Sequence, residues 1–402
     1  ILGLDYTWNL FPGLPGFFSL NRFLFLGVLF LDLLLYSDKY LRAGKIYLIW
    51  SLILIGCLPY LLFDSGDLES SPLNLVLKLI GSFAYLLFFY VNCQNGKIAG
   101  RISTILMLST GVLAVYVLGG ELGMFGGKIH RWRGAVEFTS ASGIFDPNVF
   151  TLYYLPVFAF APFLRLRVRE ERERGTDLFS VIFVCFCLVT FFFLNTRAGS
   201  LGVAAALAGA LFLRLLIVSG KNGGGRWPVM TFSALVVGAL IYANIQYDLL
   251  GPIIGIWGET DLATDTSFAT RLSSYRYLAN DLLTSPNLFG VGYRDFWLRT
   301  GWQYYWPHSV FVDCYLQGGL LFLISYLGLY LWSVTVALRG VWSGRDRVGK
   351  SCFAGFFCFL AGLLPLTVTL SIGGYKLPWA IMGCTLGLAA ARLSGRGDQE
   401  AD

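Results

Sequence analysis

Long apolar runs alternate with short polar connections along almost the whole chain. Most runs are close to 20 residues, the length of helix that crosses a hydrocarbon core about 30 Å thick. Strands of an outer-membrane barrel alternate residue by residue over about ten residues, and the chain lacks that pattern. The pattern predicts an all-α polytopic membrane protein in which residues 1–402 form a single transmembrane domain. We place eleven spans at about 17–36, 45–63, 73–92, 100–120, 148–164, 178–195, 199–218, 228–245, 309–338, 351–370 and 377–391.

Composition agrees with this interpretation. The chain is 56% hydrophobic and 13% charged, whereas soluble domains carry about 25% charged residues. The formal net charge of +6 is modest, and nothing in the sequence indicates nucleic-acid binding. The eight cysteines lie in or at the ends of apolar runs, so we expect buried, inert thiols rather than a disulfide framework. No Cys/His spacing suggests a metal site.

Lys and Arg gather on one side of the predicted helices. When the connections are assigned alternately to two sides, the set that includes the C-terminus holds 18 Lys and Arg and the opposite set holds nine. The positive-inside rule therefore puts the C-terminus in the cytoplasm. This orientation puts Ile1 outside, so we expect a further helix before it, which would give twelve spans.

Two outer connections are larger than the others, one at 121–147 and one at 246–308. A connection as long as the second is usually functional or disordered, and its many aromatic residues favour a folded loop. Residues 270–283 have apolar positions spaced for one face of an amphipathic helix. Residues 287–293 predict a Gly-rich turn.

Positive charge on the outer side runs against the sorting bias, so it suggests an anionic ligand. Arginine grips phosphate groups with a planar, bidentate fork. Arg197 joins two spans with almost no loop, and Arg271 and Arg276 lie on the predicted loop helix. Lys376 is a further outer cation. The alternatives are that Arg197 anchors a helix end by snorkelling and that Arg276 lies on a solvated face.

The segment 301–319 joins the large outer loop to the next apolar helix. His308 is one of two histidines in the chain, and its ordinary pKa near neutrality suits a general base. Trp302, Tyr305 and Trp306 are candidates for stacking on sugar rings. The alternatives are an interfacial or capping histidine and the aromatic belt that lines membrane surfaces.

Asp146 and Asn148 flank Pro147 at the start of a predicted span. Their polar groups are candidates for binding sugar hydroxyls, and a helix N-cap explains them equally well. The chain has no phosphate-binding loop, dinucleotide fingerprint or Ser-His-Asp pattern, so coupling to ATP by this chain is not expected. No cofactor is expected either.

From about residue 100 onward the chain resembles the superfamily of O-antigen ligases and O-antigen polymerases. The twelve-span layout and the large late outer loop are similar. An Arg and a Leu separated by three residues match Arg197 and Leu201, and a His and a Gly separated by ten residues match His308 and Gly319.

Two further motifs of that superfamily occur in the same order. A loop arginine ahead of a Pro-Leu-Gly-Val-Gly-Tyr-like turn is similar to Arg271 ahead of residues 285–293. An Asn-Pro-Asn-like start of a span resembles residues 146–148. The chain departs from the family at Ala198, where Gly is frequent, and at Ser309, where Asn is common.

The resemblance implies a metal-independent, inverting glycosyltransferase with a C-type membrane fold and a periplasmic active site in the bacterial inner membrane. The donor would be an oligosaccharide on undecaprenyl diphosphate, and the acceptor a glycan or glycolipid. Arg197 and Arg271 would hold the diphosphate, and His308 would orient or deprotonate the acceptor hydroxyl. Other implied partners are membrane lipid and a regulator of chain length.

The shared motifs leave two activities open. We expect a polysaccharide polymerase, with a ligase that moves the finished glycan onto lipid A–core as the alternative. A more remote alternative is a lipid-linked oligosaccharide flippase. Transporters place polar groups near the bilayer midplane, often on broken helices in repeated halves, and the sequence shows no repeat.

Overall fold

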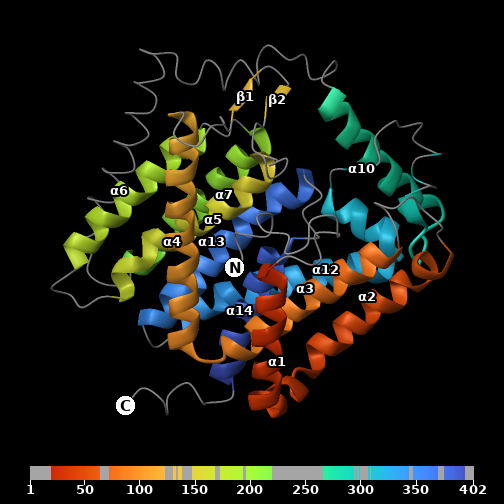
Figure 1. The fold of residues 1–402 in the computed structure, drawn as a ribbon, viewed down its shortest axis with the longest axis horizontal. Coiled ribbons are helices and arrows are strands. Elements are labelled where there is room, and N and C mark those ends of the chain that lie inside the picture. Colours follow the sequence, from red (N-terminus) through yellow and green to blue (C-terminus); the bar gives the residue numbers. More distant parts are fainter. Residues whose placement is uncertain are drawn as a thin grey trace.

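The computed structural model is almost wholly helical (Figure 1). It describes residues 20–63, 72–122, 130–132, 135–137, 147–167, 173–192, 196–219, 266–293, 296, 298, 307, 309–343, 347–369 and 375–393. The helices are α1 (Leu20–Leu41), α2 (Gly44–Phe63), α3 (Pro72–Asn92), α4 (Gly96–Glu121), α5 (Pro147–Phe160), the 3₁₀ helix η2 (Ala161–Arg167), α6 (Glu173–Phe192), α7 (Arg197–Ser219), α10 (Thr266–Thr284), α12 (Val310–Ser343), α13 (Arg347–Thr369) and α14 (Lys376–Leu393). A small antiparallel hairpin pairs β1 (His130–Trp132) with β2 (Ala135–Glu137).

The helices follow the predicted apolar runs. Ten of the eleven predicted spans fall on described residues, and each coincides with a helix; the remaining one, at 228–245, lies outside the described residues. The amphipathic helix predicted at 270–283 is confirmed as α10. The hairpin within the 121–147 connection was not predicted, because its strands are only three residues each and show no extended alternation.

Four helices in the described part of the chain are long and apolar enough to cross a membrane: α2, α4, α12 and α13. Several shorter apolar helices accompany them. Large apolar side chains on these helices are exposed, among them Leu62 at 70% and Ile105 at 64%. Water would oppose such exposure, whereas acyl chains would not. These features are those of a helical membrane-embedded protein.

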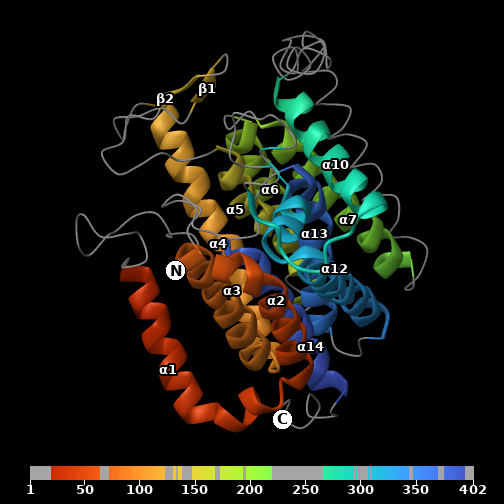
Figure 2. The ribbon, with the colours of Figure 1, turned by 90° about the vertical axis from the view of Figure 1, so that its right-hand side faces the viewer.

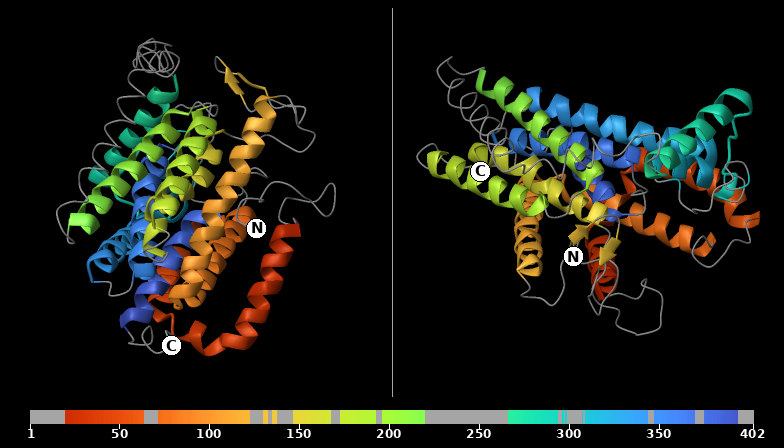
Figure 3. Two further views of the ribbon diagram at one scale, coloured as in Figure 1. Left: turned by 90° about the vertical axis from the view of Figure 1, so that its left-hand side faces the viewer. Right: turned by 90° about the horizontal axis from the view of Figure 1, so that it is seen from above.

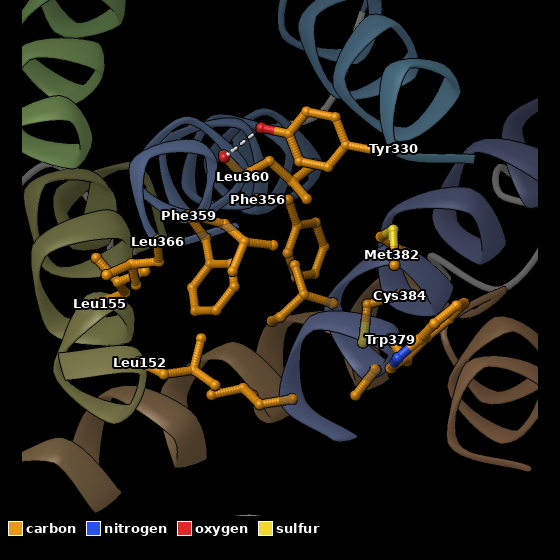
Figure 4. Packing of buried hydrophobic residues seen from close by; sticks show 14 of the residues in the cluster. Leu152, Leu155, Tyr330, Phe356, Phe359, Leu360, Leu366, Trp379, Met382 and Cys384 are labelled. Atoms are coloured by element: carbon orange, nitrogen blue, oxygen red, sulfur yellow. Dashed lines mark hydrogen bonds between the residues drawn. The ribbon is translucent and has the colours of Figure 1, made fainter. Parts of the chain in front are cut away.

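Helix α13 occupies the middle of the bundle, packed between α5 and α7 on one side and α12 on the other (Figures 1 and 3). Helix α12 also packs on α2, and α14 packs on α3. The core that these helices enclose is aromatic and aliphatic, with Phe356, Phe359 and Trp379 fully buried. Within this core the Tyr330 hydroxyl donates to the carbonyl oxygen of Leu360 at 2.7 Å (Figure 4).

The described elements mark two opposite ends of the bundle. The β1–β2 hairpin and α10 lie at one end, while the α1–α2 turn, the α3–α4 turn and the end of α14 lie at the opposite end (Figures 2 and 3). Arg271 and Arg276 therefore lie on a helix at the same end of the bundle as the hairpin.

Helix α12 is not the continuous span that the sequence predicts. Gly319 has φ 61° and ψ −154°, which breaks the helix nine residues after its start. The backbone N–H groups of Leu320 and Leu321 donate to the carbonyl oxygens of Asn287 and Leu288, at 2.9 and 3.3 Å. Residues 287 and 288 therefore supply the hydrogen bonds that the helix lacks at the break, and the periodicity of α12 does not predict these partners.

All eight cysteines lie at described positions, and none forms a disulfide. Seven are buried, as predicted. Cys185 on α6 is exposed, so the prediction of burial is wrong for this residue. An apolar run does not tell which face of its helix turns toward the bundle.

Candidate functional site

Two side chains of α10 bind the end of α13. The Nε of Arg271 donates to the carbonyl oxygen of Thr369 at 3.1 Å. The hydroxyl of Tyr275 donates to the carbonyl oxygen of Val368 at 2.7 Å. Arg271 and Tyr275 are four residues apart and so lie on one face of α10. The last carbonyls of a helix lack partners within it and carry partial negative charge. Arg271 and Tyr275 therefore cap α13.

Tyr275 also connects this helix end to α12. Its hydroxyl lies 2.8 Å from the hydroxyl of Ser309, which is fully buried. Because the single phenol proton is given to Val368, the Ser309 hydroxyl is the donor in this contact. The carbonyl of Ser309 accepts from the backbone N–H of Asp313 at 2.9 Å and so begins α12. Three helices meet at one phenol.

The charges around Tyr275 oppose one another. Burial raises the pKa of the Tyr275 phenol above its ordinary value of 10.0, the Ser309 hydrogen bond and the Arg271 charge lower it, and the Asp313 charge raises it. The net direction is upward, so the phenol stays protonated and remains a donor at neutral pH. Both a guanidinium and a carboxylate therefore lie within electrostatic reach of one hydroxyl.

The start of α7 lies at the same end of α13. The two helices are antiparallel: Gly202 lies against Gly362 and Leu366, whereas Gly209, two turns later, lies against Cys358. Continuing this register back by five residues puts the backbone of Arg197 beside the last turn of α13. The side chain of Arg197 lies outside the described residues.

The entrance to α7 is held by small and hydroxylated residues. The hydroxyl groups of Thr196 and Thr151 are 3.1 Å apart, and both residues are buried. A Cβ on Gly199 would lie 2.0 Å from Thr196 Oγ1 and 2.4 Å from Thr151 Oγ1. Gly199 thus permits the close approach of α7 to α5 that fixes the backbone at Arg197.

The sequence did not predict a second polar cluster, which Tyr293, Asp313 and Gln317 form. The Tyr293 hydroxyl donates to Asp313 Oδ1 at 3.0 Å, and Gln317 Nε2 donates to the Tyr293 oxygen. Asp313 is 8% exposed. The spacing of Ser309, Asp313 and Gln317 at four-residue intervals marks a polar stripe on an apolar helix, which is the signal in the sequence. Its partner Tyr293 is known only from the fold.

A third group ties the end of α10 to α12. Two groups donate to Asp281 Oδ2: the hydroxyl of Tyr315, and the side-chain amide of Asn287 at 3.0 Å. The backbone N–H of Asn287 in turn donates to the Tyr315 hydroxyl at 3.0 Å. Asp281 is 1% exposed. This buried carboxylate, together with the Arg271–Tyr275 cap, fixes α10 at both ends.

Of the remaining predicted residues, some are described and others lie outside the described residues. Arg276 is exposed on α10, which agrees with a solvated face, and Lys376 begins α14 next to Gly81 of α3. Asn148 lies in the first turn of α5, but its side chain is outside the described residues. The others outside them are His308, Asp146, Trp302, Tyr305 and Trp306.

Two of the predicted site residues, Arg271 and Arg197, thus lie at one helix end together with Ser309, which was not predicted. The side chain of Arg271, the backbone of Arg197 and Ser309, which follows His308 in the sequence, all lie at the C-terminal end of α13. Among the described residues, no group of three His, Cys, Asp or Glu side chains is arranged to hold a metal ion. No protein-family model matches the chain, and no curated protein matches it in sequence.

Proposed function

We propose that the protein is a glycosyltransferase of the bacterial inner membrane that moves a glycan from undecaprenyl diphosphate to an acceptor sugar hydroxyl. We further propose that it is a polysaccharide polymerase acting on the periplasmic side. The observation that carries the proposal is the convergence of Arg271, the start of α7 and Ser309 at one end of α13. It supports a site built from distant segments around an anionic group.

The diphosphate is the natural ligand for the two arginines. A guanidinium has five N–H donors, so the bond from Arg271 Nε to Thr369 is compatible with further bonds to phosphate oxygens. The N-terminus of α7 adds the positive end of a helix dipole beside Arg197. Together these groups would stabilise the charge that develops on the leaving diphosphate, the largest electrostatic demand of the reaction.

The reaction follows from these roles. The acceptor oxygen attacks the anomeric carbon from the face opposite the diphosphate and forms the new glycosidic bond. The bond from the anomeric carbon to the diphosphate oxygen breaks, and the configuration inverts. His308 accepts the proton of the acceptor hydroxyl, as a base with an ordinary pKa near neutrality can. Undecaprenyl diphosphate leaves with the bonding electrons.

The experiment is transfer by the purified protein in detergent, with a fluorescent glycan on undecaprenyl diphosphate as donor. Arg271→Ala and His308→Ala are expected to lower kcat by about 100-fold or more, the usual loss when a transition-state stabilising group is removed. Arg101→Ala serves as the matched control. It removes an exposed cation near the start of α4, at the other end of the bundle from α10. Full activity in both site variants, with normal thermal unfolding, would contradict the proposed site.

A ligase is the second candidate, because the Arg197–Leu201 and His308–Gly319 spacings match the ligases. A strain that lacks the gene distinguishes the two activities. Single repeat units on the acceptor lipid indicate a lost polymerase. Long chains that accumulate on undecaprenyl diphosphate indicate a lost ligase.

A lipid-linked oligosaccharide transporter is the third candidate. The break of α12 at Gly319 favours it, since transporters build their sites on discontinuous helices. The detergent assay decides between transfer and transport. Turnover without a bilayer cannot be transport across one, whereas a protein that moves lipid-linked glycan across vesicles and never transfers it would overturn the glycosyltransferase proposal.

A further inference from the structure

Residues 285–290 follow α10 in the chain, and their backbone is hydrogen-bonded to α2 and to the part of α12 where that helix breaks. The carbonyls of Asn287 and Leu288 accept from Leu320 and Leu321 of α12, as described above. The backbone N–H of Gly290 donates to the carbonyl oxygen of Gly56 in α2 at 3.0 Å. The segment therefore packs against both α2 and α12.

Only glycine fits where these three segments meet. A Cβ on Gly290 would lie 2.1 Å from the carbonyl oxygen of Gln317, and one on Gly319 would lie 2.5 Å from the backbone of Leu288. A Cβ on Gly56 would lie 2.4 Å from the carbonyl oxygen of Gly318. Backbones this close cannot separate without loss of the hydrogen bonds, so the position of Gly290 against Gly56 is well defined.

The depth of Gly56 in the membrane follows from α2. Its 20 residues, Gly44–Phe63, make a helix about 30 Å long, which equals the thickness of the hydrocarbon core. Three carboxylates, Asp64, Asp67 and Glu69, follow it directly in the sequence and fix the membrane surface at its end. Gly56 lies seven residues before Phe63, so it is at most about 10 Å below that surface.

The chemistry of the connection suits this depth. Residues 285–293 contain no charged side chain. Non-helical backbone is tolerated within a membrane only when its polar groups are bonded to protein. Besides the bonds to α2 and α12, the backbone N–H of Asn287 donates to the Tyr315 hydroxyl, and that of Ser285 to the carbonyl of Asp281.

We infer that residues 285–290 form a re-entrant segment that dips into the leaflet next to the α10 end of the bundle, with Leu288 and Phe289 in contact with acyl chains. These two side chains are 50% and 41% exposed. Ile55 of α2 and Ile324 of α12, near the same junction in the sequence, are exposed as well, at 45% and 63%. These four exposed side chains are apolar, and at hydrocarbon depth lipid is the partner that fits them.

The test measures depth directly in vesicles of phosphatidylcholine. A fluorophore is attached at Leu288→Cys, with Asn280→Cys, on an exposed position of α10, as the matched control. Both are made in a Cys185→Ser background, because the other seven thiols are buried. We expect the label at 288 to be quenched more by acyl-chain nitroxides than by headgroup nitroxides and to be several-fold less accessible to aqueous iodide than the label at 280.

Equal iodide quenching at the two positions would overturn the inference. Phe289→Cys repeats the measurement at the neighbouring exposed residue, so a variant that fails to fold does not decide the outcome. Because the measurement needs no turnover, its result is independent of whether the protein is a glycosyltransferase.

Discussion

The Nε of Arg271 lies 3.1 Å from the carbonyl oxygen of Thr369, the last residue of α13. A side chain from α10 thereby caps the helix at the centre of the bundle. The same contact puts a guanidinium where the C-terminal ends of helices attract cations. Arg271 therefore has a structural role beside the ligand role proposed for it, and experiments have to separate the two.

Replacement of Arg271 by Ala or Lys separates these roles. The Ala variant loses both the hydrogen bond and the charge at the end of α13, and we expect a loss of about 1–3 kcal/mol of stability. The Lys variant keeps the charge and should lose less stability, yet its turnover should fall because a point charge lacks the bidentate fork. Thermal unfolding and steady-state kinetics on the same preparations check this. Equal kcat for the Lys variant and the wild type would argue against a bidentate phosphate contact.

Tyr275→Phe removes the hydroxyl that joins α10, α12 and α13. The carbonyl of Val368 and the hydroxyl of Ser309 both lose a partner, so we expect the variant to be about 1–3 kcal/mol less stable. Tyr36→Phe, at an exposed tyrosine of α1, is the control and should be close to neutral. Chemical denaturation in detergent measures both. A neutral Tyr275→Phe would show that the cap contributes little to folding.

The alkaline stability of the protein should depend on Tyr275. Burial raises the pKa of this phenol above 10.0, so at high pH the unfolded chain releases the proton before the folded protein does. The contribution of Tyr275 is therefore complete below about pH 10 and is lost as the pH rises toward the higher folded pKa. Thermal unfolding followed between about pH 8 and pH 11 should show a steeper decline for the wild type than for Tyr275→Phe. Parallel curves would contradict this assignment.

Gly319→Ala tests the break in α12. The residue has φ 61°, and its Cβ would meet the backbone of Leu288 at 2.5 Å, so we expect a loss of about 2–6 kcal/mol. Gly328→Ala lies in the same helix with nothing within 4 Å of the new Cβ, and it should be neutral or up to about 1 kcal/mol stabilising. Yield and thermal unfolding of the pair report the difference. Equal stabilities would mean that the break is not required.

Gly199→Ala tests how the start of α7 is positioned. The new methyl group would displace the paired hydroxyls of Thr151 and Thr196, and we expect about 1–3 kcal/mol of destabilisation together with lower turnover. Gly209→Ala, ten residues along the same helix, meets only atoms at 3.6 Å or more and should leave both quantities unchanged. Assays of the two variants side by side compare a shifted α7 with an unshifted one. Wild-type kinetics for Gly199→Ala would show that the position of Arg197 tolerates this shift.

Much of the secondary structure was predictable because it depends on neighbours in the chain. The long apolar runs that fall on described residues form helices, since an unpaired backbone is too costly in hydrocarbon. The amphipathic spacing at 270–283 gave α10 for the same local reason. The break at Gly319 was missed because it depends on carbonyls at 287 and 288, which the residues around Gly319 do not encode.

The candidate site shows the same division. The sequence by itself determined which polar and charged residues stand out on an apolar chain: Arg197, Arg271 and the segment around His308, with Asp313 and Gln317 on the helix that follows. Only the tertiary structure decided which of them meet. The meeting of Arg271 with Thr369, of Tyr275 with Ser309 and of Tyr293 with Asp313 joins residues 20 to 98 positions apart. Such contacts result from the packing of whole helices around α13, and no local pattern of side chains specifies them.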